Sequence, residues 1–312
     1  MRVAAIDQGT NTTRLLVADV EDGDVEEVSK RTEITRLGEG VDARRRLLPL
    51  PITRVRNVLT DYRREAERLG AERILLTATS AARDAENGEA FLGEIEWSFG
   101  FVTRLLSGDE EAELTFRGAA DGRDGATLVV DPGGGSTEFV VGESGRVRSR
   151  TSVDIGSVRL TERFLRSDPP SPDEQQACAV HVRSSLPSPP DVDLALGVAG
   201  TVTTLAALDL GRDDPEGLGT HGHRLTLDAV GRQRERLASL PLDERRRLPG
   251  LHPERAPVIV AGAIIVENVI GAFDREALEV SERDILHGAA LEAAELPAPV
   301  EGAAPPGAYT CC

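Results

Sequence analysis

Asp7-Gln8-Gly9-Thr10-Asn11-Thr12 and Asp131-Pro132-Gly133-Gly134-Gly135-Ser136 are two versions of one short pattern, and together they decide the fold. The first follows the apolar run 3–6 and the second follows the run 128–130, and each leads into another apolar run. Both patterns therefore predict a strand, a tight turn and a second strand. Glycines let a backbone approach an anion closely, and an Asp at a strand end is placed to hold a metal ion or a water. Two such loops predict a phosphate clamp.

The composition indicates a two-domain protein and limits its partners. The chain has 312 residues, 40% of them hydrophobic, which is enough for two sizeable cores. A formal net charge of −17 argues against nucleic acid and anionic membranes as partners, because both require a basic face. A polyanionic substrate would have to meet local arginines or metal ions. Lys30 is the single lysine among 36 basic residues, so arginine richness alone says little about function.

Cysteine usage and hydropathy favour a cytoplasmic location. Cys178 and the pair 311–312 show neither metal-ligand spacing nor a disulfide framework, which predicts free thiols. We expect no signal peptide, because Arg2 is followed at once by a predicted strand. The longest apolar stretch, 258–273, is interrupted by polar residues and predicts a buried helix rather than a membrane span.

Two halves of the chain have the same predicted order of strands and helices. The first has strands at 3–6, 15–18, 25–28, 74–77 and 101–106, and helices at 52–69, 85–92 and 109–117. The second has strands at 127–131, 139–142, 147–153, 194–198 and 277–280, and helices at 160–165 and 173–185 and from 203, 226, 256 and 284. The glycine-rich segment 118–125 separates them. This pattern predicts a duplicated α/β domain with a cleft between the copies.

A third glycine-rich segment, 197–204, follows a predicted strand and opens a helix. The first N–H groups of such a helix point at a bound anion, which makes Gly200 and Thr201 candidates for phosphate binding. Taken alone, the pattern is as frequent in plain packing as in ligand binding.

These motifs resemble the exopolyphosphatase and guanosine pentaphosphate phosphatase (Ppx/GppA) family, within the superfamily of sugar kinases, heat-shock chaperones and actin. The resemblance covers about residues 1–295 through six segments in order, namely 7–12, 79–85 (Thr-Ser-Ala-Ala-Arg-Asp-Ala), 107–112 (Ser-Gly-Asp-Glu-Glu-Ala), 131–138, 154–159 and 197–204. It implies the short form with duplicated actin-like (ribonuclease H-like) domains. These would be 1–121 joined by the C-terminal helix 284–296, and 122–283, with 297–312 a disordered tail.

The resemblance also implies catalytic roles. Glu111 would be the general base that orients and deprotonates a water, and Arg83 would contact phosphate oxygens as a planar fork. Without the motif, any Glu in the run 109–111 would more often be a solvent-facing helix residue. Glu110 is expected on another side of the helix, at the surface.

Metal and phosphate ligands follow from the same motifs. Asp131 and Glu138 are the expected Mg²⁺ carboxylates, with Asp7 as a third candidate, because Mg²⁺ prefers oxygen ligands; another divalent or a monovalent ion is an alternative. An Asp at a strand end also commonly caps a turn. The expected phosphate donors are Thr10, Asn11, Thr12 and Arg14 on the first loop and Gly133, Gly134, Gly135 and Ser136 on the second.

The sequence therefore predicts an exopolyphosphatase that releases terminal orthophosphate by direct attack of water, with guanosine pentaphosphate as the alternative substrate. A phosphotransferase and a low-activity or non-catalytic sensor are further hypotheses. Two departures from the family pattern, Gln8 and Pro132, bear on the last, because proline lacks a backbone N–H. The runs 44–46 and 245–247, three arginines each, would either guide polyphosphate or form solvated faces. A homodimer is implied by the resemblance alone.

Overall fold

The computed structural model describes residues 1–120, 125–213 and 219–297. It divides into two compact units, Met1–Leu114 with the segment that begins at Ile285, and Thr115–Asp284. The division falls between Leu114 and Thr115, within the helix Gly108–Ala119. The sequence placed the boundary in 118–125, of which residues 121–124 lie outside the described residues. The expected tail also lies outside them from residue 298 onward.

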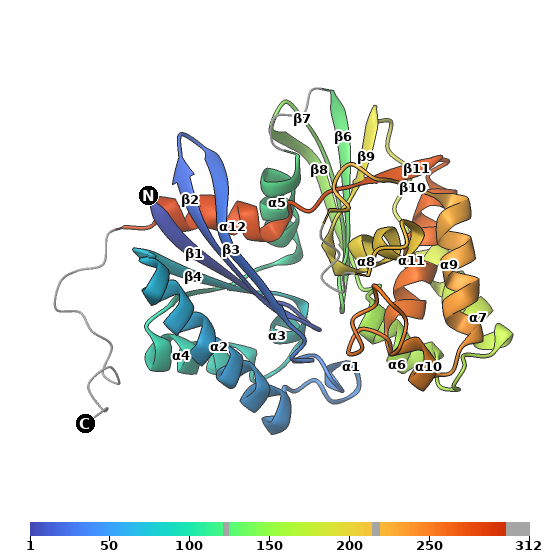
Figure 1. Cartoon of the computed structure of the whole chain (residues 1–312), viewed down its shortest axis with the longest axis horizontal. Helices are drawn as coiled ribbons and strands as arrows, with labels where there is room; N and C mark the ends of the chain where they lie inside the picture. The colour runs from blue at the N-terminus through green and yellow to red at the C-terminus, as the bar shows by residue number, and fades with distance from the viewer. Residues whose placement is uncertain (121–124, 214–218, 298–312) are drawn as a thin grey trace. The chain divides into compact units, whose positions relative to one another are not determined.

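Unit 1 is a five-stranded mixed sheet between helices (Figure 1). Its elements are β1 (Arg2–Gln8), β2 (Thr13–Glu21), β3 (Asp24–Glu33), α1 (Val41–Arg44), α2 (Pro49–Leu69), β4 (Arg73–Ala78), α3 (Ser80–Asp84), α4 (Gly88–Phe99), β5 (Val102–Leu105), the start of α5 (Gly108–Ala119), and α12 (Ile285–Glu295). The strand order is β3-β2-β1-β4-β5. The β1–β2 and β2–β3 pairs are antiparallel and the other two are parallel.

Both faces of this sheet are buried, because apolar residues occupy successive positions of β1 and β2. Ala4, Ile6 and Leu15 point to the face covered by α2 and α4. Val3 and Leu16 point to the other face, where α12 packs. Since successive strand residues alternate between faces, an unbroken apolar run is the pattern that a doubly covered strand requires.

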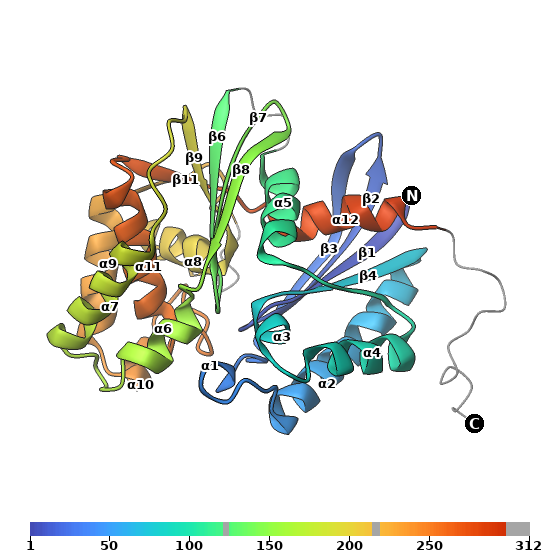
Figure 2. The same cartoon turned by 180° about the vertical axis from the view of Figure 1, so that it is seen from behind.

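Unit 2 repeats this arrangement with one more strand (Figure 2). Its elements are β6 (Ala126–Pro132), β7 (Thr137–Glu143), β8 (Arg146–Val153), α6 (Ser157–Phe164), α7 (Pro172–Ser185), β9 (Leu194–Gly197), α8 (Ala199–Asp209), β10 (Arg224–Thr226), α9 (Leu227–Ser239), α10 (Leu242–Arg245), α11 (Ile259–Ala272) and β11 (Ala277–Val280). The order β8-β7-β6-β9-β11 matches β3-β2-β1-β4-β5 strand for strand, and β10 is added at the edge. The duplicated α/β fold predicted from the sequence is confirmed.

Several short elements differ from the predictions. The helix expected at 85–92 is replaced by α3 and by α4, which begins at Gly88. The helix expected from residue 203 begins at Ala199. α1, α10 and β10, each three or four residues long, were not predicted. Within the described ranges, no helix combines the length and apolar character needed to cross a bilayer.

Candidate functional site

The first loop is a tight hairpin turn between β1 and β2. The Gly9 amide donates to the Thr12 carbonyl at 2.9 Å. Behind the loop, the amides of Arg36 and Gly38 donate to the carbonyls of Asn11 and Thr10 at 2.9 and 2.8 Å. The amides of Thr10 and Asn11 themselves donate to none of the described residues. With the loop carbonyls bound, these N–H groups, together with that of Thr12, are available to an anion.

Gln8 and Gly38 support this loop. The Gln8 side chain is 1% exposed; it donates to the Gly9 carbonyl at 3.0 Å and accepts from the Thr13 hydroxyl at 2.7 Å. A Cβ on Gly38 would lie 2.2 Å from Cγ2 of Thr10, so the backbone at 38 touches the loop directly. The buried Gln8 side chain thus stabilises the loop, and an amide suits this position because it can donate to the Gly9 carbonyl and accept from the Thr13 hydroxyl at the same time.

Asp7 and Arg14 form an ion pair at the end of the same hairpin. They are register partners in the β1–β2 ladder, and Nη2 of Arg14 lies 2.7 Å from Oδ2 of Asp7. Nε of Arg14 donates to the same oxygen at 3.0 Å. Arg14, expected to bind phosphate, therefore offsets the charge of Asp7, expected to bind metal.

Glu111 and Arg83 also lie together in unit 1. Glu111 is in the first turn of α5 and is 8% exposed. Its Oε2 accepts from Nη1 of Arg83 at 3.1 Å, and the same nitrogen donates to the Leu106 carbonyl at 2.7 Å. The arginine thereby fixes the direction of the carboxylate.

The neighbouring Glu110 has a different role. It is exposed, and its carboxylate accepts from the amide and the hydroxyl of Ser107 at 2.8 and 2.7 Å, while the Ser107 hydroxyl accepts from the Glu110 amide at 3.2 Å. This reciprocal pair is a capping box at the start of α5. Its hydrogen bonds to Ser107, first that from the amide, lower the pKa of Glu110. Glu110 therefore holds the end of the helix that presents Glu111.

The second loop repeats the first. The Gly133 amide donates to the Ser136 carbonyl at 2.9 Å, and the amides of Ser157 and Val158 donate to the carbonyls of Gly133 and Gly134 at 3.0 and 2.8 Å. A Cβ on Gly156 would lie 2.3 Å from the Gly134 oxygen, so Gly156 supports this loop as Gly38 supports the other.

The carboxylates of the second hairpin, Asp131 and Glu138, lie opposite each other. They are register partners in the β6–β7 ladder, which places their side chains on one face, and they are 7% and 1% exposed. Hydroxyls donate to both, Thr115 to Asp131 at 3.3 Å and Ser152 to Glu138 at 2.7 Å. Where the first hairpin has an acid facing a base, the second has two buried acids, an arrangement that a cation stabilises.

Pro132 fits the hairpin without loss of a backbone hydrogen bond. Because Gly133 and Ser136 form a hydrogen-bonded pair, the adjacent Pro132–Thr137 pair is of the non-hydrogen-bonded kind. On the other side of β6, the ladder with β9 ends at the Val130–Gly197 pair. The equivalent ladder of unit 1 runs on to the Gln8–Ala78 pair, so Pro132 leaves the β6–β7 hairpin bonds intact and coincides with the earlier end of the β6–β9 ladder.

Gly200 and Thr201 lie in the first turn of α8, beside a buried arginine. A Cβ on Gly200 would lie 2.5 Å from Nη2 of Arg255, and Nη1 of Arg255 donates to the Thr204 hydroxyl. A Cβ on Gly262 would lie 2.6 Å from Cγ2 of Thr201. Both packing and anion binding remain compatible with this segment.

Comparison with known proteins identifies the family. The profile of the Ppx/GppA phosphatase family matches residues 16–295. The chain belongs to the Ppx/GppA phosphatase family. The protein named exopolyphosphatase 2 of Mycobacterium tuberculosis is 43% identical to it over 94% of this chain and 98% of its own. The solved structure of the Aquifex aeolicus Ppx/GppA enzyme superimposes with a TM-score of 0.77 at 33% identity, covering 94% of this chain and 99% of that one. A guanosine-5'-triphosphate,3'-diphosphate pyrophosphatase of Vibrio vulnificus is 28% identical over 93% of this chain and 58% of its own.

The resemblance drawn from the motifs is thus confirmed, and the structure sorts this Ppx/GppA chain's candidate residues into two sets. Unit 1 groups Asp7 with Arg14, and Arg83 with Glu111, and holds the loop 9–12. Unit 2 groups Asp131 with Glu138 and holds the loop 133–136 and the start of α8.

Two buried arginines were missed by the sequence interpretation. Nε of Arg159, 6% exposed, donates to the Gly135 carbonyl at 2.7 Å and so braces the second loop from behind. Arg255, 8% exposed, braces the start of α8. Arg159 ends the segment 154–159 that carried part of the family resemblance, so its motif was the available signal; Arg255 had none.

Proposed function

We propose that this protein is a phosphoanhydride hydrolase, an exopolyphosphatase that releases orthophosphate from the end of inorganic polyphosphate. The carrying observation is the buried Glu111 carboxylate held by Arg83 in the first turn of α5, in a chain of the Ppx/GppA family. Direct hydrolysis needs an oriented water and donors for the phosphoryl oxygens, and no thiol or imidazole nucleophile.

Glu111 is the proposed general base. Its carboxylate accepts a proton from the water whose oxygen attacks the terminal phosphorus. The bridging P–O bond breaks, and its electron pair stays on the shortened chain. Base catalysis of this kind contributes about 10²–10⁴-fold to the rate. Arg83 uses Nη1 to hold the carboxylate, and among the described residues its Nε and Nη2 carry no other bond, so we propose that they donate to phosphoryl oxygens.

Phosphate is proposed to bind through the two repeated loops. In unit 1 the donors are the amides and side chains of Thr10, Asn11 and Thr12. In unit 2 they are the amides of Gly133, Gly134 and Gly135 and the hydroxyl of Ser136, with Gly200 and Thr201 at the start of α8 as further candidates. We expect Arg14 to act mainly through Asp7, because its guanidinium is already bound there.

The residues present fit a divalent cation at the second hairpin. No group of three or more His, Cys, Asp or Glu side chains in the described part of the chain is placed to bind a metal. Mg²⁺ does not require one, since it is held by one or two carboxylates together with waters and substrate phosphate. We propose that Asp131 and Glu138 hold Mg²⁺, which would offset charge on the transferred phosphoryl group. Asp7 is the weaker candidate, because Arg14 neutralises it.

Guanosine pentaphosphate is the alternative substrate. It is favoured by the similarity to the Vibrio vulnificus pyrophosphatase. The sensor hypothesis is weakened, since Pro132 costs the hairpin no hydrogen bond. The homodimer, the cytoplasmic location and the absence of nucleic-acid and membrane partners stay predictions.

The test supplies polyphosphate, guanosine pentaphosphate, or ATP with sugar acceptors to purified protein with Mg²⁺ and follows orthophosphate. We expect release from polyphosphate, and a loss of about 10²–10⁴-fold in Glu111→Gln. Glu110→Gln is the matched control, because Gln preserves a capping box and removes the same charge. Absence of release from both phosphate substrates, or equal rates for wild type and Glu111→Gln, would refute the hydrolase proposal.

A further inference from the structure

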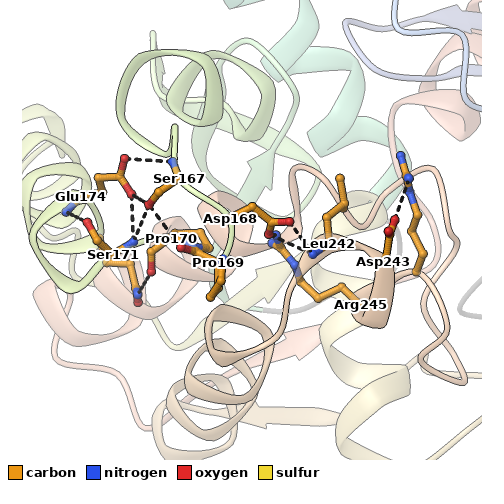
Figure 3. A network of polar contacts seen from close by, with 11 residues as sticks. Ser167, Asp168, Pro169, Pro170, Ser171, Glu174, Leu242, Asp243 and Arg245 are labelled. Atoms are coloured by element: carbon orange, nitrogen blue, oxygen red, sulfur yellow. Dashed lines mark hydrogen bonds and ion pairs between the residues drawn. The ribbon is translucent and has the colours of Figure 1, made fainter.

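The chain contains two runs of three arginines, which differ in burial and in their contacts. The run 245–247 lies at the end of α10 in unit 2. Arg245 is 4% exposed, and its Nη2 donates to Oδ1 of Asp168 at 3.0 Å (Figure 3). Burial lowers the pKa of Arg245. Arg246 pairs with Asp243 at 3.4 Å. This run is therefore structural, and Arg245 ties the loop before α7 to α10.

The run Arg44-Arg45-Arg46 in unit 1 has no such role. All three side chains are exposed, and within the described residues none of them forms an ion pair or a side-chain hydrogen bond. Arginines elsewhere on this surface commonly have a carboxylate partner, as Arg54 has Glu39 at 2.8 Å. In a chain of net charge −17, three adjacent unneutralised guanidinium groups form a local positive patch.

The backbone of this patch is firmly held despite its exposure. The Arg45 carbonyl accepts from the Glu86 amide at 2.9 Å. The Leu47 amide donates to the Asn87 side chain at 2.8 Å, and that side chain returns a bond to the Leu47 carbonyl at 3.1 Å. Arg45 is at φ 53, a left-handed conformation that is unfavourable for a residue other than glycine. The turn is thus a preformed support for charged side chains.

These backbone hydrogen bonds place the patch near Arg83, which holds Glu111. Glu86 follows Arg83 by three positions, so the chain from the Arg83 Cα to the Glu86 amide spans at most about 10 Å. Adding the 2.9 Å hydrogen bond puts the Arg45 carbonyl within about 13 Å of the Arg83 Cα. From the other side, Gly38 contacts Thr10 of the first loop, and α1 then runs from Val41 to Arg44.

We infer that the Arg44–Arg46 turn binds the non-reacting phosphates of a long polyanionic chain whose end is processed beside Arg83 and Glu111. The inference rests on the proposed function. Guanidinium groups bind phosphate oxygens through paired donors, and an extended polyphosphate presents such oxygens at every unit. With its terminal phosphate beside Arg83, a long chain has many further units to offer the turn, whereas tripolyphosphate has two, so we expect the patch to favour long chains.

The test compares Arg44→Gln/Arg46→Gln with the control Arg246→Gln/Arg247→Gln. Each double variant removes two positive charges, and each leaves intact the backbone-defining residue of its run, Arg45 or the buried Arg245. For each protein, kcat/KM is measured on long-chain polyphosphate and on tripolyphosphate at several salt concentrations.

In the first variant we expect the ratio of long-chain to tripolyphosphate kcat/KM to fall about three- to tenfold through KM. Its salt dependence should weaken, by about 1.4 in the log–log slope if each arginine acts like a single-strand phosphate contact. The control should keep the wild-type ratio. A wild-type ratio in the first variant, or an equal fall in the control, overturns the inference while leaving the hydrolase proposal intact. A wild type that hydrolyses neither substrate refutes the proposed function instead.

Discussion

Gly156→Ala is the substitution with the best-defined steric consequence. The added Cβ would lie 2.3 Å from the Gly134 oxygen and 2.4 Å from the carbonyl carbons of Gly134 and Gly135. Ordinary van der Waals contact begins at 3.4 Å, so the loop or the Gly156 backbone has to move by about 1 Å. All three contacted atoms are backbone, and no rotamer change can relieve the overlap. Gly156 is at φ −131, so alanine introduces no backbone strain of its own.

The displaced atoms belong to the proposed phosphate donors of the second loop. A misplacement of about 1 Å in a positioning group costs about 10²-fold in rate. We therefore expect kcat/KM for orthophosphate release to fall about 10²-fold, and overpacking to lower the free energy of unfolding by about 1–3 kcal/mol. The rate is measured at a temperature where circular dichroism shows the variant to be fully folded.

Two glycine variants provide controls. Gly93→Ala in α4 meets no atom within 4 Å and should leave the rate unchanged while slightly stabilising the helix. Gly38→Ala is the matched change at the first loop: it meets mainly Cγ2 of Thr10, a side-chain atom that can rotate away, so it should move the loop backbone less than Gly156→Ala while disturbing the Thr10 hydroxyl. A folded Gly156→Ala protein with the wild-type rate would refute the idea that this loop positions phosphate.

Three further predictions follow from the second unit. Glu138→Gln removes one of two facing buried acids, so we expect it to raise the melting temperature of the metal-free protein. It should also abolish the stabilisation by Mg²⁺. In wild type this stabilisation reaches about 2.7 kcal/mol when the Mg²⁺ concentration is a hundred times Kd. Equal Mg²⁺-induced shifts in scanning calorimetry would exclude Glu138 as a ligand. The Glu174 carboxylate accepts from Ser167 and Ser171, and these bonds lower its pKa from 4.5 to about 2. Because the pKa of Glu174 is lower in the folded protein than in the unfolded one, its ionised carboxylate stabilises the fold at pH above about 4.5, and this stabilisation is lost as the pH falls toward 2. In urea unfolding experiments, the free energy of unfolding of Glu174→Gln should therefore fall less than that of wild type over this pH range. Parallel pH dependences of the two proteins would contradict this. Pro132→Leu should keep the hydrolytic rate and change the free energy of unfolding by less than about 1.5 kcal/mol, and a large loss of activity would show that the proline shapes the loop.

The hairpins were predictable from the sequence because their signals are local. An apolar run, an Asp-x-Gly turn and a second apolar run fix strand, turn and strand without reference to distant residues. The same local reasoning failed at α3 and α4. α3 has five residues, too few to show helical periodicity. α4 begins at Gly88, where a Cβ would lie 1.9 Å from the Ala82 oxygen, so tertiary packing rather than helix propensity selects this glycine.

The candidate site was predictable as a set of motifs but not as a set of contacts. The roles expected for Arg14 and Arg83 were both phosphate binding, whereas the structure shows each arginine bound to a carboxylate, Asp7 or Glu111. Side-chain pairing of this kind depends on strand register and on loops far apart in the chain. Register could have been counted in one case, because Asp7 and Arg14 have the same spacing around their turn as Asp131 and Glu138.

That shared spacing explains how one duplicated hairpin can serve two purposes. Both copies keep the turn hydrogen bond, from Gly9 to Thr12 in one and from Gly133 to Ser136 in the other, so the amide groups of the loop are presented alike. The difference lies in the residue opposite the aspartate. Arg14 closes the first pair internally, and we propose that the first loop binds anions through its amides and hydroxyls. Glu138 makes the second pair doubly negative in a buried position, which favours a bound cation. On the proposed roles, a single cross-strand position therefore separates an anion-binding hairpin from one suited to a metal-bound phosphate.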